Sequence, residues 1–198
     1  LTAGNGWLAL RAASLMLTGV AAFLTARHLA ALGQGPVLLG WCGVAGVIGA
    51  ATGLAQAYGA QSPLFATTRI PGGTFGNRNF MAHFATLTLP PLVLIALTAR
   101  RRWSAALATI GCCALAAAII LSRSRAAWLG ATVALAIFTL IFVGARRRHA
   151  LPPLGLRAAL VGTLLGVGAL AAIVLPNHLS WRSASPYTDT LAGLANHE

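Results

Sequence analysis

Residues 104–121 read SAALATIGCCALAAAIIL, an uncharged run between two groups of arginines. A run of this length is close to the roughly 20 apolar residues that a helix needs to cross the hydrocarbon core of a bilayer. Similar runs occur on both sides, and the six predicted spans are residues 8–26, 36–57, 80–98, 104–121, 126–143 and 156–175. Arg, Pro, Gly or Asn borders each span, as is typical of membrane helices. We therefore predict an all-α fold, a polytopic transmembrane helical bundle.

The composition of the chain agrees with this prediction. Of its 198 residues, 58% are hydrophobic and only 8% are charged, whereas soluble domains carry roughly 25% charged residues. No signal-peptide pattern opens the chain, and the apolar runs are too many and too long for a targeting segment alone. One transmembrane domain accounts for residues 1–178. Because the chain starts at Leu1 without a methionine and stops in the polar stretch ANHE, we expect it to be part of a longer protein.

The chain carries a formal net charge of +12, and all of its basic residues are arginines. A GC-rich genome would produce the same preference for Arg over Lys, and that explanation stays open. The only acids are Asp189 and Glu198, so phosphate groups, lipid headgroups or another part of the protein must supply the counter-charge. Cys42, Cys112 and Cys113 lie inside apolar runs, where a thiol behaves as a small apolar residue. We predict neither a disulfide nor a metal site.

Arginines in the short connections predict the orientation, because cytoplasmic loops are enriched in Lys and Arg. ARRRW at 99–103 follows the third predicted span, and ARRRH at 145–149 follows the fifth. Both are expected to be cytoplasmic, and alternation puts the first connection, with Arg27 and His28, on the same side. The segments expected outside are residues 58–79, residues 122–125 and the tail after Pro176.

Several arginines nevertheless fall on the predicted outer side, namely Arg69, Arg78, Arg123, Arg125 and Arg182. One interpretation is snorkelling, in which a long side chain at a helix end reaches the headgroups. The stretch SRSRAAW at 122–128 favours a different interpretation, in which the arginines bind an anion. It is a tight reversal between two spans, so its arginines lie at the membrane boundary, where an unpaired charge is costly. Guanidinium groups bind phosphate oxygens bidentately and would stabilise a diphosphate leaving group, so we predict a diphosphate-binding site here.

The stretch RIPGGTFGNRN at 69–79 offers further groups of this kind. Gly72, Gly73 and Gly76 permit backbone conformations that direct N–H groups toward an anion. Asn77 and Asn79 supply amide donors and acceptors, and Asn79 is also expected to cap the third span.

Three further features lie within the predicted spans. His83, one turn beyond Asn79 on the same face, is a candidate proton shuttle, although an interfacial polar residue is the alternative. Pro90 and Pro91 are expected to kink the third span. Small residues recur three or four apart in 40–53 and 162–168, a spacing that lets helix backbones approach closely in lipid.

The order and membrane context of these motifs resemble the O-antigen ligase and polymerase superfamily of bacterial envelope proteins. In that family the first motif looks like an Arg, then Gly-Thr-Phe, then two asparagines flanking a residue that is commonly Pro. This chain has Arg78 at that middle position. The second motif looks like Ser-Arg followed by small residues, which corresponds to Ser124 and Arg125 within LSRSRAAWLG at 121–130. The resemblance covers the chain from about residue 36 onward.

The resemblance implies a multi-pass protein of the bacterial inner membrane whose periplasmic face transfers a glycan from an undecaprenyl-diphosphate carrier to an acceptor. Its partners would be the lipid-linked glycan, the acceptor and the phospholipid bilayer, with no nucleic acid and no cofactor. Residues 179–198 would begin a large periplasmic loop, and the catalytic base would lie beyond Glu198. The residues expected to bind the diphosphate are Arg69, Arg125, Arg123, Arg78, Asn77, Asn79 and Ser124. A metal-independent mechanism is expected, since a divalent cation would need carboxylates, and these occur only in the tail.

Two alternatives from other classes stay open. An anion transporter, of the bicarbonate type to which some relatives of this superfamily have been assigned, would use the outer arginines as a vestibule. Arginines at mid-membrane depth would favour it, but the spans from 36 to 143 hold none at their centres, and Arg11 lies near the outer end of the first span. The other alternative is a noncatalytic membrane protein.

Overall fold

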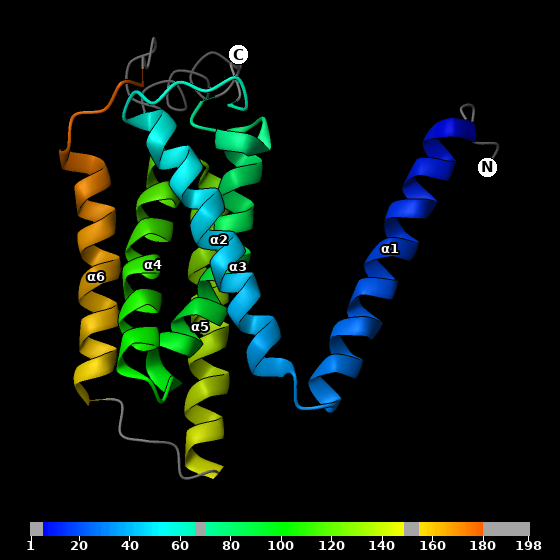
Figure 1. Ribbon diagram of the computed structural model, residues 1–198, viewed down its shortest axis with the longest axis vertical. Coiled ribbons are helices and arrows are strands. Elements are labelled where there is room, and N and C mark those ends of the chain that lie inside the picture. The colour runs from blue at the N-terminus through cyan, green and yellow to red at the C-terminus, as the bar shows by residue number, and fades with distance from the viewer. Residues whose placement is uncertain (1–5, 66–69, 149–154, 180–198) are drawn as a thin grey trace, which may run out of the picture.

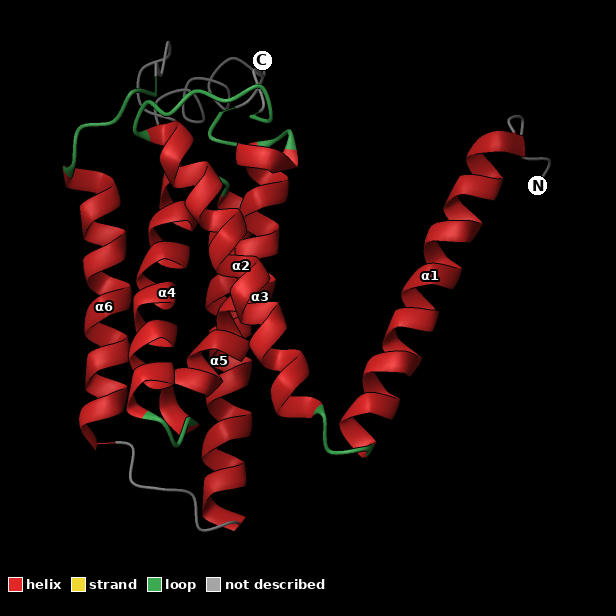
Figure 2. Ribbon diagram, viewed as in Figure 1, coloured by secondary structure: helices red, strands yellow, loops and turns green. Residues whose placement is uncertain are grey.

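The computed structural model describes residues 6–65, 70–148 and 155–179, which form six α-helices and one short 3₁₀ helix (Figure 1). The elements are α1 Gly6–Ala31, α2 Gly35–Ala57, η1 Gly73–Phe75, α3 Arg78–Thr98, α4 Arg102–Leu121, α5 Arg125–Arg148 and α6 Gly155–Val174. Helices and loops account for the whole described part of the chain (Figure 2). All six α-helices are long and apolar enough to cross a membrane. The predicted all-α transmembrane bundle is confirmed, and the protein is a multi-pass membrane protein.

Two helices continue well past the C-terminal ends predicted for them. α1 continues to Ala31, so Arg27 and His28 lie in its last turns and not in the first connection. α5 continues to Arg148, beyond the predicted end at residue 143. The physical reason is that arginine is a good helix former, and cations in the last turn interact favourably with the unpaired carbonyls there. The hydrophobic pattern therefore marks the apolar core of each span better than the end of its helix.

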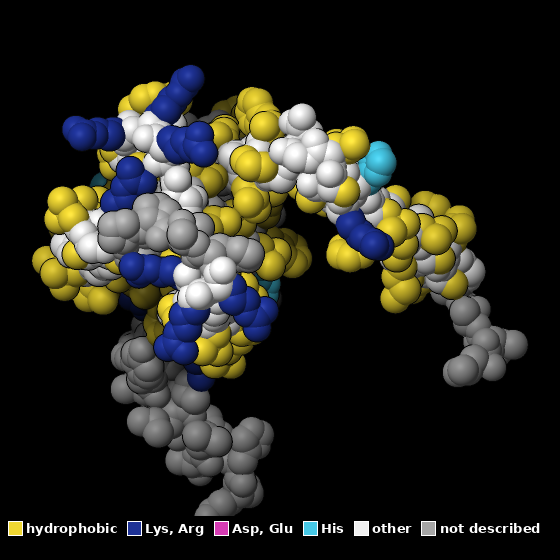
Figure 3. All heavy atoms as spheres, turned by 90° about the horizontal axis from the view of Figure 1, so that it is seen from below, with side chains coloured by type: hydrophobic (Ala, Val, Ile, Leu, Met, Phe, Trp, Pro, Cys, Tyr) yellow, Lys and Arg dark blue, Asp and Glu magenta, His cyan; other side chains and the backbone are white. Residues whose placement is uncertain are grey.

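The helices run alternately up and down, so their connections gather at two ends of the bundle (Figure 1). We call the end where α2, α4 and α6 begin the lower end, and the opposite one the upper end. Figure 3, seen from below, shows basic side chains spread over the lower end. They are Arg27, Arg100, Arg101, Arg102, Arg146, Arg147, Arg148 and Arg157. The upper end carries Arg78, Arg123 and Arg125, with Arg11 in the second turn of α1. Neither acidic residue of the chain lies in its described part.

α3 is the central helix and contacts α2, α4, α5 and α6. One of its faces is buried, and Met81, Leu89 and Leu92 form part of the main core with residues of α4 such as Leu115. The helix passes through Pro90 and Pro91 without a break, so any bend caused by their missing N–H groups leaves it continuous. This arrangement makes α3 the support on which both turns of the upper end are built.

Glycines bring α2 onto α3. Gly43, Gly46, Gly49 and Gly53 are buried, and a Cβ atom at each would meet a side chain of α3 or, at Gly49, also Phe75 of η1. The predicted role of this stretch in close packing is confirmed for these four residues. It is wrong for Gly40, where no neighbouring atom lies within 4 Å of the Cβ position.

On α6 only the last of the predicted small residues packs against another helix. A Cβ atom at Gly168 would overlap the backbone carbonyl of Cys113 in α4, whereas Gly162 and Gly166 have no atom within 4 Å. Packing through a continuous stripe at 162–168 is therefore wrong, because only one face of α6 touches α4. Gly168 is the point of closest approach between the two helices among these positions.

α1 stands apart from the other helices (Figure 1). It is joined to α2 at the lower end by residues 32–34, its contacts among the described elements are with α2 alone, and none of its residues is buried. Large apolar side chains such as Trp7, Leu15 and Phe23 are exposed around it. In a bilayer these faces are available to lipid.

The chain returns to the bundle after α6. The backbone N–H of His178 donates to the carbonyl of Ala57 at 2.8 Å, and Leu179 is buried with Ala57, Leu121 and Ala172. The domain boundary predicted after residue 178 thus falls within packed residues. The predicted loop that follows, together with Arg182, lies outside the described residues.

Candidate anion-binding site at the upper end

The loop before α3 is fastened to the last turns of α2. The side-chain oxygen Oε1 of Gln56 accepts hydrogen bonds from the backbone N–H groups of Gly72, at 2.8 Å, and Gly73, at 2.9 Å. Gly73 has a φ of +50°, and a Cβ atom there would lie 2.8 Å from the backbone nitrogen of Gly53. Glycine is required at this position by both its conformation and the space around it. The predicted use of the Gly72 and Gly73 amides toward an anion is wrong, because Gln56 engages both.

The same loop sets the start of α3. Phe75 packs against Phe84 with ring centroids 5.1 Å apart, and Asn77 follows as the N-cap. The Asn77 side-chain oxygen accepts a hydrogen bond from the backbone N–H of Asn79 at 2.9 Å. The predicted capping role of Asn79 therefore belongs to Asn77, and α3 begins at Arg78 and not at residue 80. A capped N-terminus presents the positive end of the helix dipole at the upper end.

The turn between α4 and α5 is held by a buried serine and a half-buried tryptophan. Ser122 is fully buried, and its hydroxyl donates to the carbonyl of Ile119 at 2.6 Å while accepting from the backbone N–H of Ser124 at 3.2 Å. The indole N–H of Trp128 donates to the same Ile119 carbonyl at 3.0 Å. These bonds fix the backbone on both sides of Arg123.

Arg123 adopts a left-handed conformation, with a φ of +50°. For a residue with a Cβ atom this conformation costs roughly 1–2 kcal/mol. Such outliers persist only where the surrounding structure imposes them, and they cluster at functional sites. No sequence pattern indicated the strained backbone of Arg123.

Arg78 and Arg123 come from different turns but lie close enough for their charges to interact. Partial burial is the larger cause that lowers the pKa of Arg123, and the positive charge of Arg78 is the second. A guanidinium group in a protein carries its positive charge at any physiological pH. The folding of two separate connections thus brings like charges together at one end of the bundle, an arrangement that favours a bound anion.

Among the described residues, the other predicted site residues lie at the same end of the bundle. Arg125 begins α5 and is exposed, Ser124 is buried in the turn, and Asn79 is half-buried in the first turn of α3. His83 is exposed on α3. Their roles stay predictions, and Arg69 lies outside the described residues.

Sequence reasoning assigned no role to Gln56 or Ser122. Gln56 was recognisable as a lone amide in the last turn of an otherwise apolar span, which indicates a local hydrogen-bonding duty. The partners of that amide, sixteen and seventeen residues further along the chain, follow only from the tertiary fold.

The Gln56→Leu variant should lower the free energy of unfolding by about 2 kcal/mol, because two part-buried amides lose their acceptor. Gln56→Glu retains an acceptor oxygen and should restore most of the loss. The measurement is the thermal unfolding midpoint in detergent, with the exposed Gln61→Leu as the control. A midpoint for Gln56→Leu equal to that of Gln61→Leu would show that Gln56 does not stabilise the loop.

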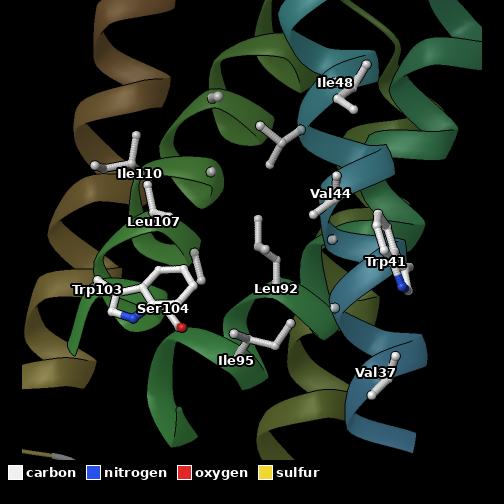
Figure 4. A pocket seen from close by; sticks show the side chains of 16 residues that line it. Val37, Trp41, Val44, Ile48, Leu92, Ile95, Trp103, Ser104, Leu107 and Ile110 are labelled. Atoms are coloured by element: carbon white, nitrogen blue, oxygen red, sulfur yellow. The ribbon is translucent and has the colours of Figure 1, made fainter. Parts of the chain in front are cut away.

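A cavity of about 580 Å³ lies elsewhere, between α2 and α4 over Leu92 and Ile95 of α3 (Figure 4). Its wall is almost entirely apolar and includes Trp41 and Trp103, which line it from the lower halves of their helices. None of the predicted site residues lines it. The cavity suits a hydrocarbon chain, and it is separate from the arginine pair.

Comparison of the chain with protein-family models, curated proteins and solved structures finds no match. The resemblance to the O-antigen ligase and polymerase superfamily therefore stays a hypothesis carried by the motifs at 69–79 and 121–130. The neighbouring arginines are an observation independent of that hypothesis.

Proposed function

We propose that this protein binds a lipid-linked diphosphate at its upper end and transfers the attached glycan to an acceptor hydroxyl. The observation that carries the proposal is the gathering of Arg78, Arg123 and Arg125 at the upper end, in two connections that are each held by their own hydrogen bonds. Guanidinium groups bind phosphate oxygens bidentately, so several arginines at one end of the bundle suit a diphosphate. The helix N-termini of α3 and α5 lie at the same end and add a favourable field for an anion.

The distribution of arginines supports a periplasmic location for this site in a bacterial inner membrane. The lower end carries both arginine triplets, at 100–102 and 146–148, and the enrichment of cytoplasmic loops in Arg favours that end as cytoplasmic. The upper end would then face the periplasm, where a lipid-linked glycan presents its sugar. The undecaprenyl carrier comes from the motif resemblance alone.

In the proposed reaction the acceptor hydroxyl oxygen attacks the anomeric carbon of the glycan. A new glycosidic bond forms, and the bond between that carbon and the diphosphate oxygen breaks, with its electron pair leaving on the diphosphate. The hydroxyl proton goes to a general base that is not identified among the described residues. Arg78 and Arg123 would stabilise the charge growing on the leaving group, since preorganised donors in a fixed geometry act most strongly on developing charge. Arg69 and Arg125 would assist, as the motif resemblance implies.

The proposal is tested with membranes containing the protein, an undecaprenyl-diphosphate-linked labelled glycan and its acceptor. Arg78→Ala and Arg125→Ala should each reduce transfer at least about tenfold at unchanged protein level, as loss of one stabilising donor predicts. Arg11→Ala is the matched control, because it removes one positive charge from the same end on the separate helix α1. Full transfer in both site variants would refute the proposal.

The transporter alternative is distinguished in the same membranes. All described arginines lie within two turns of a helix end or in connections, so none lines a path at mid-membrane depth within the described residues. Arginine-dependent uptake of a labelled anion into liposomes, without glycan transfer, would favour a transporter over the proposed transferase.

A further inference from the structure

The lower end contains a pocket of about 370 Å³ between α4 and α6. Arg102 and Arg157 line it from the first turns of the two helices, at the level of the helix ends. Ile110, Leu160 and Leu164 line it further along the same helices, toward the middle of the span. The pocket is therefore basic at the membrane boundary and apolar toward the bilayer interior.

Arg157 is held in place by the end of α3. Its Nη1 group donates hydrogen bonds to the carbonyl of Leu97, at 3.2 Å, and the carbonyl of Ala99, at 2.8 Å. Those bonds use one nitrogen of the guanidinium group, which leaves the N–H groups on its other nitrogens for a ligand. No carboxylate is present in the described part of the chain to neutralise either arginine. Arg157, held by α3, and Arg102 thus make the mouth of the pocket cationic, whereas the lining toward the bilayer interior is apolar.

We propose that this pocket binds an anionic phospholipid, with the headgroup phosphate between Arg102 and Arg157 and one acyl chain along Ile110, Leu160 and Leu164. Basic pockets between transmembrane helices at the membrane surface are suited to anionic headgroups. A phosphate at the mouth satisfies the charge, and an acyl chain fills the part of the pocket that a free phosphate leaves empty. This lipid site lies at the end opposite the arginine pair and does not depend on the proposed transferase activity.

The experiment uses the purified protein, delipidated in a neutral detergent and titrated with short-chain phosphatidylglycerol. Phosphatidylcholine of the same chain length and inorganic phosphate are titrated in parallel, and binding is followed as a shift of the thermal unfolding midpoint. Phosphatidylglycerol should stabilise the protein, whereas the other two should not. Arg102→Gln should weaken phosphatidylglycerol binding about fivefold, as expected for loss of one arginine beside an anionic headgroup.

Two further variants separate the site from general charge and from folding. Arg147→Gln removes an arginine from the same end without touching the pocket, so it should bind the lipid as the unmodified protein does. Arg157→Gln should also weaken binding, but it removes the two hydrogen bonds to the end of α3. If Arg157→Gln fails to fold, the result for Arg102→Gln decides whether the pocket binds the lipid. Equal stabilisation by phosphatidylcholine or by inorganic phosphate would overturn the proposal. Equal weakening by Arg147→Gln and Arg102→Gln would also overturn it.

Discussion

The Arg123→Gly variant should lose about 100-fold or more of glycan-transfer activity, as loss of one preorganised donor predicts, while its unfolding midpoint stays at or above that of the unmodified protein. Glycine removes the guanidinium group that faces the proposed diphosphate. It also relieves the left-handed strain at φ +50°, worth about 1–2 kcal/mol, against an entropy cost of about 0.5–1 kcal/mol. The variant therefore separates the chemical role of this residue from its structural one.

Arg123→Ala is the matched control, since alanine lacks the guanidinium group but keeps the Cβ atom. Its activity should equal that of Arg123→Gly, and its midpoint should be lower. The measurements are transfer in isolated membranes and thermal unfolding in detergent. Full activity of Arg123→Gly would remove Arg123 from the proposed binding site, and equal midpoints of the two variants would contradict the strain at this position.

The largest structural effect is expected at Gly168. Gly168→Val places side-chain atoms where the carbonyl of Cys113 lies, and backbone atoms cannot move aside as a flexible side chain can. Overpacking of this kind costs about 3 kcal/mol, which corresponds to a fall of about 6–12 °C in the unfolding midpoint of a chain of this size.

Gly162→Val provides the comparison on the same helix. No atom lies within 4 Å of the Cβ position of Gly162, so the midpoint should hold or rise slightly, because valine has a better helix propensity than glycine. Similar midpoints for the two variants would contradict the close approach of α4 and α6 at Gly168.

The sequence predicted the membrane spans well because hydrophobic length is a direct physical requirement of the bilayer. α4, predicted as 104–121, is Arg102–Leu121, and α6, predicted as 156–175, is Gly155–Val174. The ends were less accurate where polar residues continue a helix, as at Arg148, or where a local cap decides, as at Asn77. Those endings depend on hydrogen bonds that hydropathy does not describe.

The sequence predicted which types of residue form the candidate site and that they share one end of the bundle, but it did not predict how they are arranged. The outer arginines stood out from their charge alone. The proximity of Arg78 and Arg123 and the capture of the Gly72 and Gly73 amides by Gln56 both arise from packing between distant segments. The left-handed conformation of Arg123 depends on the hydrogen bonds that the buried Ser122 and the half-buried Trp128 make within the turn. A single sequence contains no record of such contacts.

The binding of undecaprenyl diphosphate to the purified protein tests the central claim most directly. We expect the double variant Arg78→Gln with Arg123→Gln to bind at least about 100-fold more weakly than the unmodified protein, because each lost charge-assisted hydrogen bond is worth about 1.5–3 kcal/mol. Arg11→Gln should bind unchanged. An affinity of the double variant equal to that of the unmodified protein would contradict the assignment of the upper end as a diphosphate site.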